Sequence, residues 1–400
     1  MRASTITLPA PAEFAPDGSI RESSLVTWLQ MFVRFPSEQT SLHEQDPQIL
    51  RFIRECVEPL ARQLGAAVRY DGMGNAIVEV GPKSDDSLLF VAYAMTHPGA
   101  KMSDPFSAAV VETEKGPAVR GRGVAEQKTA LAALFGALAT ALRRNNLKRR
   151  LSIVVLTAGE TGRHDAIDSA LPKLECKPQF AVVCIGTDNR IAIGNKGRID
   201  FDVIVHGKTA HSSAPWRGVN AIGGAQKLLH SLEVFKSGVP DHPHFGATTL
   251  TATAIESSPK ATHTVPDSVR ITYDRRLLPG EDPQSAYHAI RNLIVLPEPW
   301  TVECRLGPVM HANEVPVEGR FMRKICAAFA STGQPNPEYF YCNFALDAGY
   351  LARAGIEAVM LGPGEVDQFH SNEENVLISD LVAMSNVYYG IIDQCLGHNG

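Results

Sequence analysis

The sequence predicts an α/β main domain, built on a mainly parallel sheet with helices on both faces and interrupted by a smaller α+β insert. Three continuous apolar runs have the composition of strands buried on both faces of a sheet, SLLFVAYAM (87–95), LSIVVLTA (151–158) and FAVVCIG (180–186). Helical patterns alternate with these strands, which is typical of a doubly wound sheet. From residue 199 the order changes to strand, helix, strand, strand, helix, strand, which predicts a separate antiparallel unit.

The other elements of the main domain follow from hydrophobic periodicity. Apolar positions at i, i+3 and i+4 predict amphipathic helices at 22–35 and 44–64. The segment VRYDGMGNAIVEV predicts two strands joined by a turn. After the insert the pattern predicts three further helices and one strand, at 319–331, 346–354 and from about Leu377, with the strand at IEAVMLG.

The insert is expected to have the ferredoxin-like order of a split βαβ unit. Its strands alternate apolar and polar residues, as in an antiparallel sheet with one solvated face. We therefore predict a main domain at 1–198 and 309–400 and an insert at 199–308.

Composition limits the classes of partner. The 400 residues are 44% hydrophobic and 20% charged, which allows a large core and two domains. A net charge of −5 provides no basic stripe, so nucleic acid is not an expected partner. No apolar run has transmembrane length and no signal-peptide core is seen, so we expect no membrane association and a cytoplasmic location. The seven cysteines form no CxxC pair, as in a reducing compartment.

Glu126 lies in the stretch VRGRGVAEQKTALAALFGALATAL (119–142), where a strand-like end breaks at Gly121 and Gly123 and a helical pattern follows. The pattern places Glu126 at a strand-to-helix turn, which is where open α/β sheets bind ligands. A carboxylate at a helix start is also typical of simple dipole matching. The stretch alone leaves both interpretations open.

Five loops carry a resemblance to a known family. They are THPG (96–99), GRGVAEQK (121–128), AGETG (158–162), GKTAHSSAP (207–215) and GPGEVDQFHSNEEN (362–375). Their order and spacing resemble the M20 metallopeptidases and amidohydrolases, the group of carboxypeptidase G2, aminoacylase-1 and succinyl-diaminopimelate desuccinylase. The resemblance covers almost the whole chain, and it implies that the insert is a dimerisation or lid domain and that the protein is a homodimer.

The resemblance implies a set of metal ligands. Family members hold two zinc ions about 3.5 Å apart. His97 matches the His of the family's H-x-D motif, Glu126 stands at the position of the bridging Asp, Glu160 matches the second-metal Glu, and His370 matches the C-terminal His. Glu126 and Glu160 are therefore the candidate catalytic carboxylates, and all four residues are candidate metal ligands.

Three positions depart from the family pattern. The Asp of H-x-D is Gly99, the general base is Gly159, and one first-metal carboxylate is Ile185. Without a carboxylate at 99, nothing obvious orients the His97 ring. The family's base is missing at 159, and an isoleucine donates no lone pair. His164 and Asp165 follow closely and are expected in a surface loop, although either could replace the base.

The sequence leaves the cofactor open. Glu126, Glu160 and His370, with His97 as a fourth ligand, could hold one zinc or another divalent ion. The alternative, which the pattern favours slightly, is a metal-free pocket in which these four residues bond to one another.

Three residues of the insert are candidate substrate contacts. Arg276 aligns with an Arg that grips the substrate carboxylate in relatives, a task suited to a planar bidentate donor. His211 matches a family His that reaches across the dimer to the partner's substrate and is a candidate catalytic residue. His263 replaces a family Asn in the same pocket wall.

These expectations define three hypotheses. The first is a hydrolase of a small carboxylate-bearing amide, an N-acyl amino acid or a dipeptide, with a rebuilt site. The second is a non-hydrolytic biosynthetic enzyme, such as a cyclase, condensing enzyme or lyase. The third is a catalytically inactive binding protein on the same scaffold.

Overall fold

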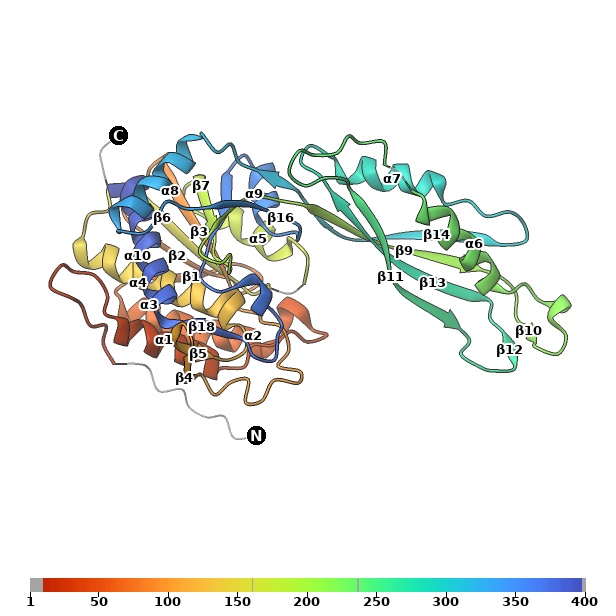
Figure 1. Ribbon diagram of the computed structural model, residues 1–400, viewed down its shortest axis with the longest axis horizontal. Helices are drawn as coiled ribbons and strands as arrows, with labels where there is room; N and C mark the ends of the chain where they lie inside the picture. The colour runs from red at the N-terminus through yellow and green to blue at the C-terminus, as the bar shows by residue number, and fades with distance from the viewer. Residues whose placement is uncertain (1–9, 160, 236, 398–400) are drawn as a thin grey trace. The chain divides into compact units, whose positions relative to one another are not determined.

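The computed structural model describes residues 10–159, 161–235 and 237–397 and divides the chain into two compact units (Figure 1). Unit 1 comprises Met1–Gly194, Val315–Phe340 and Tyr350–Gly400, and unit 2 comprises Asn195–Glu314 and Tyr341–Gly349. The second unit thus contains the predicted insert and also a short segment of the returning chain.

The central sheet of unit 1 has the strand order β1-β2-β6-β3-β7-β17-β8. Pairing is parallel where β3 meets β6 and β7 and where β17 meets β7, and antiparallel at both ends. The strands are β1 (Val68–Tyr70), β2 (Ala76–Val80), β3 (Ser87–Tyr93), β6 (Leu151–Leu156), β7 (Pro178–Val183), β8 (Ile191–Asn195) and β17 (Glu357–Met360). Every residue of β3 and β6 is buried, which confirms the interpretation of the apolar runs.

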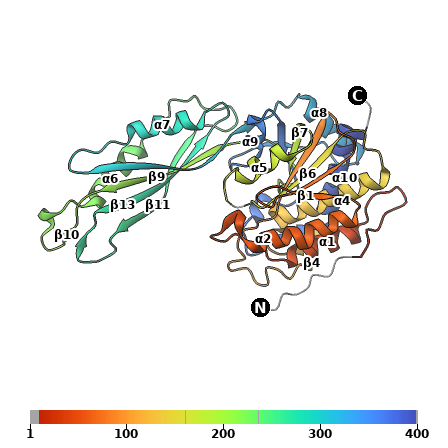
Figure 2. The ribbon, with the colours of Figure 1, turned by 180° about the vertical axis from the view of Figure 1, so that it is seen from behind.

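Helices flank this sheet on both faces (Figure 1, Figure 2). The helices α1 (Glu22–Arg34), α4 (Thr129–Arg144) and α10 (Ile378–Ile392) pack against one another. Unit 1 also contains α2 (Pro47–Phe52), α3 (Glu58–Gln63), α5 (Asp165–Ala170) and α8 (Arg320–Ser331), and α9 spans Ala348–Arg353. The mixed α/β class with a mainly parallel sheet is confirmed.

The helix expected at 44–64 is divided. Asp46 caps α2 by accepting from the Gln48 amide at 2.7 Å, and a π turn at Ile53–Val57 separates α2 from α3. Pro59 in the first turn of α3 has no N–H group and clashes with a regular helix, which accounts for the interruption.

The strand before Glu126 does not belong to the parallel sheet. β5 (Gly116–Arg120) pairs with β4 (Ala109–Thr113) and β18 (Asn375–Leu377) in a separate three-stranded antiparallel sheet. Glu126 does follow a strand at a strand-to-helix turn, as expected, but this turn is not at the edge of the parallel sheet, because β5 pairs locally with its hairpin partner β4. Because β5 also pairs with β18, the loop that carries His370 lies next to the start of the turn that carries Glu126.

Unit 2 has a four-stranded antiparallel sheet in the order β11-β13-β9-β14. Its main elements are β9 (Gly197–His206), α6 (Ala221–Glu233), β11 (Thr249–Ser258), β13 (Ser268–Leu277), α7 (Pro283–Leu293) and β14 (Thr301–Met310), which is the predicted ferredoxin-like order. Two short strands, β10 (Ala210–His211) and β12 (Thr264–Val265), pair with each other. The short strands β15 (Asn313–Glu314) and β16 (Tyr339–Cys342) lie where the chain passes between the units.

The two faces of the unit 2 sheet differ. Along β9 and β13 buried and partly exposed residues alternate, and one face packs with α6 and α7 into a core that includes Phe201, Val203 and Ile271. The other face carries charged residues such as Asp200 and Arg276. Among the described residues, no helix combines the length and the apolar character that a membrane span requires.

Candidate functional site

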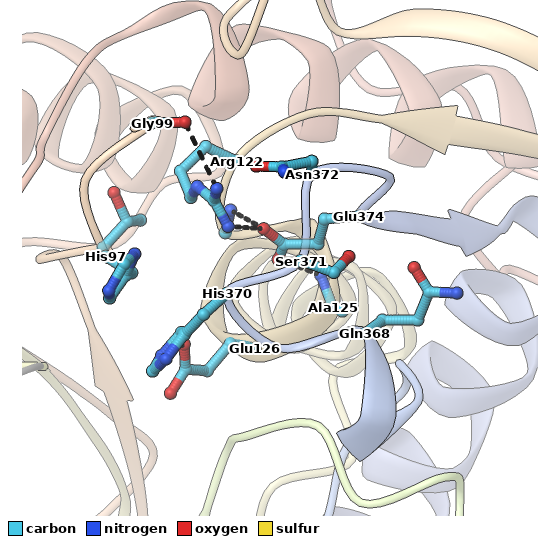
Figure 3. Close-up of polar contacts among 12 residues, drawn as sticks. His97, Gly99, Arg122, Ala125, Glu126, Gln368, His370, Ser371, Asn372 and Glu374 are labelled. Carbon is cyan, nitrogen blue, oxygen red and sulfur yellow. Dashed lines mark hydrogen bonds and ion pairs between the residues drawn. The ribbon is translucent and has the colours of Figure 1, made fainter. Parts of the chain in front are cut away.

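Three of the four predicted ligand residues come together in unit 1 (Figure 3). The Oε2 atom of Glu126 lies 3.1 Å from Nε2 of His370. The imidazole rings of His97 and His370 stack with their centroids 4.0 Å apart and their planes 17° from parallel. The fourth residue, Glu160, lies outside the described residues. The Glu126 side chain is 12% exposed and that of His370 is 44% exposed, so a small molecule can reach the cluster.

The backbone carbonyl of Pro98 orients the ring of His97. The Nδ1 atom of His97 lies 3.0 Å from that oxygen, which can only accept, so Nδ1 carries a proton. The expectation that nothing orients His97 without a carboxylate at 99 is therefore wrong. A backbone carbonyl is one of the usual partners for a ligating imidazole.

The backbone of His370 adopts φ 61°, in the left-handed region that non-glycine residues rarely occupy. Such a conformation persists only where the surroundings impose it. Four residues further along, Glu374 is fixed in the core by its ion pair with Arg122, which holds the end of this loop in place.

A buried ion pair joins the loops of the cluster (Figure 3). Nη1 of Arg122 lies 2.9 Å from Oε2 of Glu374, and both side chains are 1% exposed. The same carboxylate accepts from the amides of Gly123 at 3.0 Å and Ala125 at 2.9 Å, and Nη2 of Arg122 lies 3.4 Å from the Gly99 carbonyl oxygen. The His97, Glu126 and His370 loops thus share one polar anchor.

Burial raises the pKa of Glu374, while the amides of Gly123 and Ala125 and the charge of Arg122 oppose that rise. Sequence reasoning missed both members of this pair. The only available signals were a charged residue within GRG and a second glutamate after His370, and neither indicates a pairing across 252 positions.

The structure closes two of the positions at which the family carries carboxylates. A Cβ atom at Gly159 would lie 2.3 Å from the backbone oxygen of Met95. A Cβ atom at Gly99 would lie 2.9 Å from Cγ of Pro105 and 3.2 Å from Oε1 of Glu38, which already accepts from the Gly99 amide. At positions 99 and 159 the chain therefore lacks the family carboxylates, and neighbouring atoms also occupy the space that a side chain would need.

The third departure, Ile185, is 3% exposed and lies in the apolar interior. Asp188 does not replace it, because its Oδ1 accepts from the Val366 amide at 2.7 Å and its Oδ2 pairs with Arg190 at 2.6 Å. His164 was expected in a surface loop, but it is only 7% exposed and its ring packs 5.4 Å from that of Tyr350. That expectation was wrong for His164, whereas Asp165 is exposed.

The donors among the described residues do not by themselves make up a two-metal centre. In the part of the chain that the structure describes, no three His, Cys, Asp or Glu side chains converge as metal ligands. A single-metal set would need Glu160 in addition to Glu126, His370 and His97, and Glu160 is not described.

Lys128 anchors the turn that carries Glu126. Its buried ammonium group donates to the carbonyl oxygens of Phe32 and Phe35 at 2.8 Å each, near the end of α1, and lies 5.1 Å from the ring centroid of Phe52. Burial lowers the pKa of Lys128 to about 7. No pattern in the sequence indicates this role, because Lys128 follows Glu126 in a polar run.

The structure places the three candidate residues of the insert in two groups within unit 2. His211 and His263 are neighbours, with ring centroids 5.9 Å apart, and Nδ1 of His211 lies 2.7 Å from Oγ of Ser213. Arg276 lies elsewhere, with Nε and Nη2 each 2.9 Å from a carboxylate oxygen of Asp274. As expected, Arg275 points to the opposite face, where it forms a buried pair with Glu281.

Comparisons with known proteins agree with this architecture. Residues 193–300 match the M20 family profile described as the peptidase dimerisation domain. Among curated relatives, acetylornithine deacetylase of Myxococcus xanthus is 29% identical over 68% of this chain and 70% of its own length. Succinyl-diaminopimelate desuccinylase of Helicobacter hepaticus is 25% identical over the same shares of the two chains.

Solved structures show the same fold. An M20 family metallo-carboxypeptidase from Sulfolobus solfataricus superposes with a TM-score of 0.76 at 15% identity, covering 93% of this chain and 99% of its own. A Bacillus subtilis protein described as a dinuclear metal-binding peptidase from the M20 family gives a TM-score of 0.63 at 13% identity, covering 93% and 97%. The resemblance of this chain to the M20 peptidase family is thereby confirmed.

Proposed function

We propose that this protein is an M20-type enzyme acting on a small amide that bears a carboxylate, such as an N-acyl amino acid or a dipeptide-like molecule. The observation that carries the proposal is the retained cluster of His97, Glu126 and His370, beside a position 159 that is closed to a general base. The curated relatives named above, a deacetylase and a desuccinylase, support the substrate class.

We further propose that the family's two-zinc site is degraded. A single divalent ion would be held by Glu126, His370, His97 and Glu160, and it would supply Lewis-acid polarisation of the scissile carbonyl. Ile185 and Gly99 contribute no ligand to a second ion, so this chain would hold at most one.

Glu126 is the proposed proton acceptor. Its carboxylate is mostly buried and Oε2 accepts from Nε2 of His370, so Oε1, if no metal ion holds it, is the oxygen that would take the proton from an attacking water. Arg276 is proposed to bind the substrate carboxylate. His211, which is exposed on β10, is proposed to contact the substrate of a partner subunit, as its family counterpart does.

The dimer proposed for this chain would form through the insert. The match to a dimerisation domain supports it, as does the edge strand β11, where Ile255 is 57% exposed. Ile222 on α6 is 48% exposed. A two-fold contact is the commonest closed arrangement of identical chains.

The test combines metal content with turnover. After dialysis against zinc and then buffer, we expect fewer than two zinc equivalents per chain by elemental analysis. In a screen of N-acyl amino acids and dipeptides, Glu126→Gln should lower turnover by roughly 10²-fold or more. Glu112→Gln, the same change on the exposed strand β4, is the matched control.

Each alternative has a distinct outcome. Two tightly held zinc ions per chain would overturn the degraded site. Binding of the substrates without hydrolysis would favour a non-hydrolytic enzyme or a binding protein, and a Glu126→Gln variant with full turnover would remove Glu126 from the chemistry.

A further inference from the structure

Lys196 of unit 2 is a nearly buried cation with no anionic partner among the described residues. It is 6% exposed, and its ammonium group donates to the Ala247 carbonyl oxygen at 3.2 Å. The nearby ion pair of Arg198 with Asp200 does not include it. Burial, together with repulsion from Arg276, lowers the pKa of Lys196. An uncompensated buried charge is costly, so its presence here needs a reason beyond stability.

Arg276 lies close enough to Lys196 for the two charges to repel each other, and its guanidinium group is only partly satisfied. Asp274 occupies its Nε and Nη2 atoms, whereas Nη1 has a long 3.4 Å contact to the Asn343 carbonyl oxygen. The Lys196 amide donates to the carbonyl oxygen of Cys342, the residue before Asn343, at 3.1 Å. Lys196 through its backbone amide and Arg276 through its guanidinium group thus both contact one short segment of the returning chain. The neighbouring pair of Arg198 and Asp200 adds one charge of each sign, so the group as a whole has one more cation than carboxylates.

We propose that Lys196 and Arg276 form one anion site that holds the carboxylate of the ligand. Lys196 supplies a charge-assisted hydrogen bond to one oxygen, and Nη1 of Arg276 supplies one to the other. Asp274 fixes the guanidinium plane by its bidentate contact and so orients Nη1. The identity of the ligand, a small molecule with one carboxylate, rests on the proposed function.

The site makes a strict demand on the ligand. A carboxylate neutralises the excess positive charge, whereas a neutral amide of the same shape leaves Lys196 buried without an anion. The same ligand with its carboxylate converted to an amide should therefore be rejected, and binding should weaken as salt rises.

The experiment is isothermal titration of the full-length chain with N-acetyl-L-phenylalanine and, as the uncharged probe, N-acetyl-L-phenylalanine amide. The wild-type chain should bind the acid and not the amide. Lys196→Gln should weaken binding of the acid by roughly tenfold to hundredfold, the range for losing one charge-assisted hydrogen bond. Lys196→Arg should restore most of the affinity. Lys260→Gln, the same charge change at an exposed position of unit 2, is the matched control.

Several results would overturn the proposal: no binding of the acid, equal binding of acid and amide, or unchanged affinity in a folded Lys196→Gln variant. Hydrolysis of the same acid, measured separately, distinguishes this failure from failure of the proposed function. If binding of the acid depends on Lys196 but no hydrolysis is seen, the proposed hydrolase is wrong and the anion site stands. If the acid is hydrolysed and its KM is unchanged in Lys196→Gln, the hydrolase stands and the anion site is wrong.

Discussion

A methyl group at position 159 should destabilise this protein, although the family carries a glutamate there. A Cβ atom at Gly159 would lie 2.3 Å from the carbonyl oxygen of Met95 and 3.1 Å from its Cβ, whereas real contacts of this kind start near 3.0 Å. Because the blocking atom belongs to the backbone, a rotamer change cannot relieve the clash. Overpacking of this kind costs about 1–3 kcal/mol, and we expect Gly159→Ala to lose at least the middle of that range.

The assay is urea denaturation of the variant and of a matched control. Gly72→Ala adds the same methyl group where no heavy atom lies within 4 Å, so its free energy of unfolding should change by about 0.5 kcal/mol or less. Gly159→Glu should be at least as destabilised as Gly159→Ala and should gain no hydrolytic activity. A Gly159→Ala variant as stable as Gly72→Ala would refute the steric argument and reopen position 159 as a site for a base.

Three further outcomes follow from buried charge and exposed surface. Arg122→Met leaves the Glu374 carboxylate buried without its partner and should cost about 3–5 kcal/mol, while adding Glu374→Gln to that variant should recover part of the loss in thermal unfolding. Burial lowers the pKa of Lys128 to about 7, so between about pH 7 and 9 the folded chain has lost a proton that the unfolded chain still carries on this residue. The free energy of unfolding should therefore rise with pH over this range. Lys128→Met should flatten that rise by up to about 1.4 kcal/mol per pH unit. Light scattering at micromolar concentration should show a dimer, and Ile255→Lys on the exposed edge of β11 should shift it toward the monomer.

The fold could be predicted because its information is local in the sequence. Continuous apolar runs such as 87–95 indicate strands that are buried on both faces, and the alternation in β9 and β13 indicates a sheet with one solvated face. The pairing partner of a strand is not local. For that reason the sequence does not reveal that β5, which precedes Glu126, pairs outside the parallel sheet.

The candidate site was only partly predictable for the same reason. The resemblance of the five loops to the M20 pattern predicted His97, Glu126 and His370, and each of the three lies within one of those loops. The anchor formed by Arg122 and Glu374 joins residues 252 positions apart, and no pattern in either segment specifies the other. The carbonyl of Pro98, which orients His97, offers no side-chain signal at all.

The closed positions change how the missing carboxylates should be understood. Restoring the family residues by Gly99→Asp, Glu126→Asp, Gly159→Glu and Ile185→Glu would be expected to rebuild zinc binding if the site had lost side chains alone. Here Met95 occupies the space beside Gly159, and Glu38 already binds the Gly99 amide, where a new carboxylate would meet it at close range. Like charges so placed cannot both ionise without cost. The backbone at 99 and 159 thus leaves little room for the missing carboxylates, and on the proposed function we expect the chemistry to depend on the pair of Glu126 and His370.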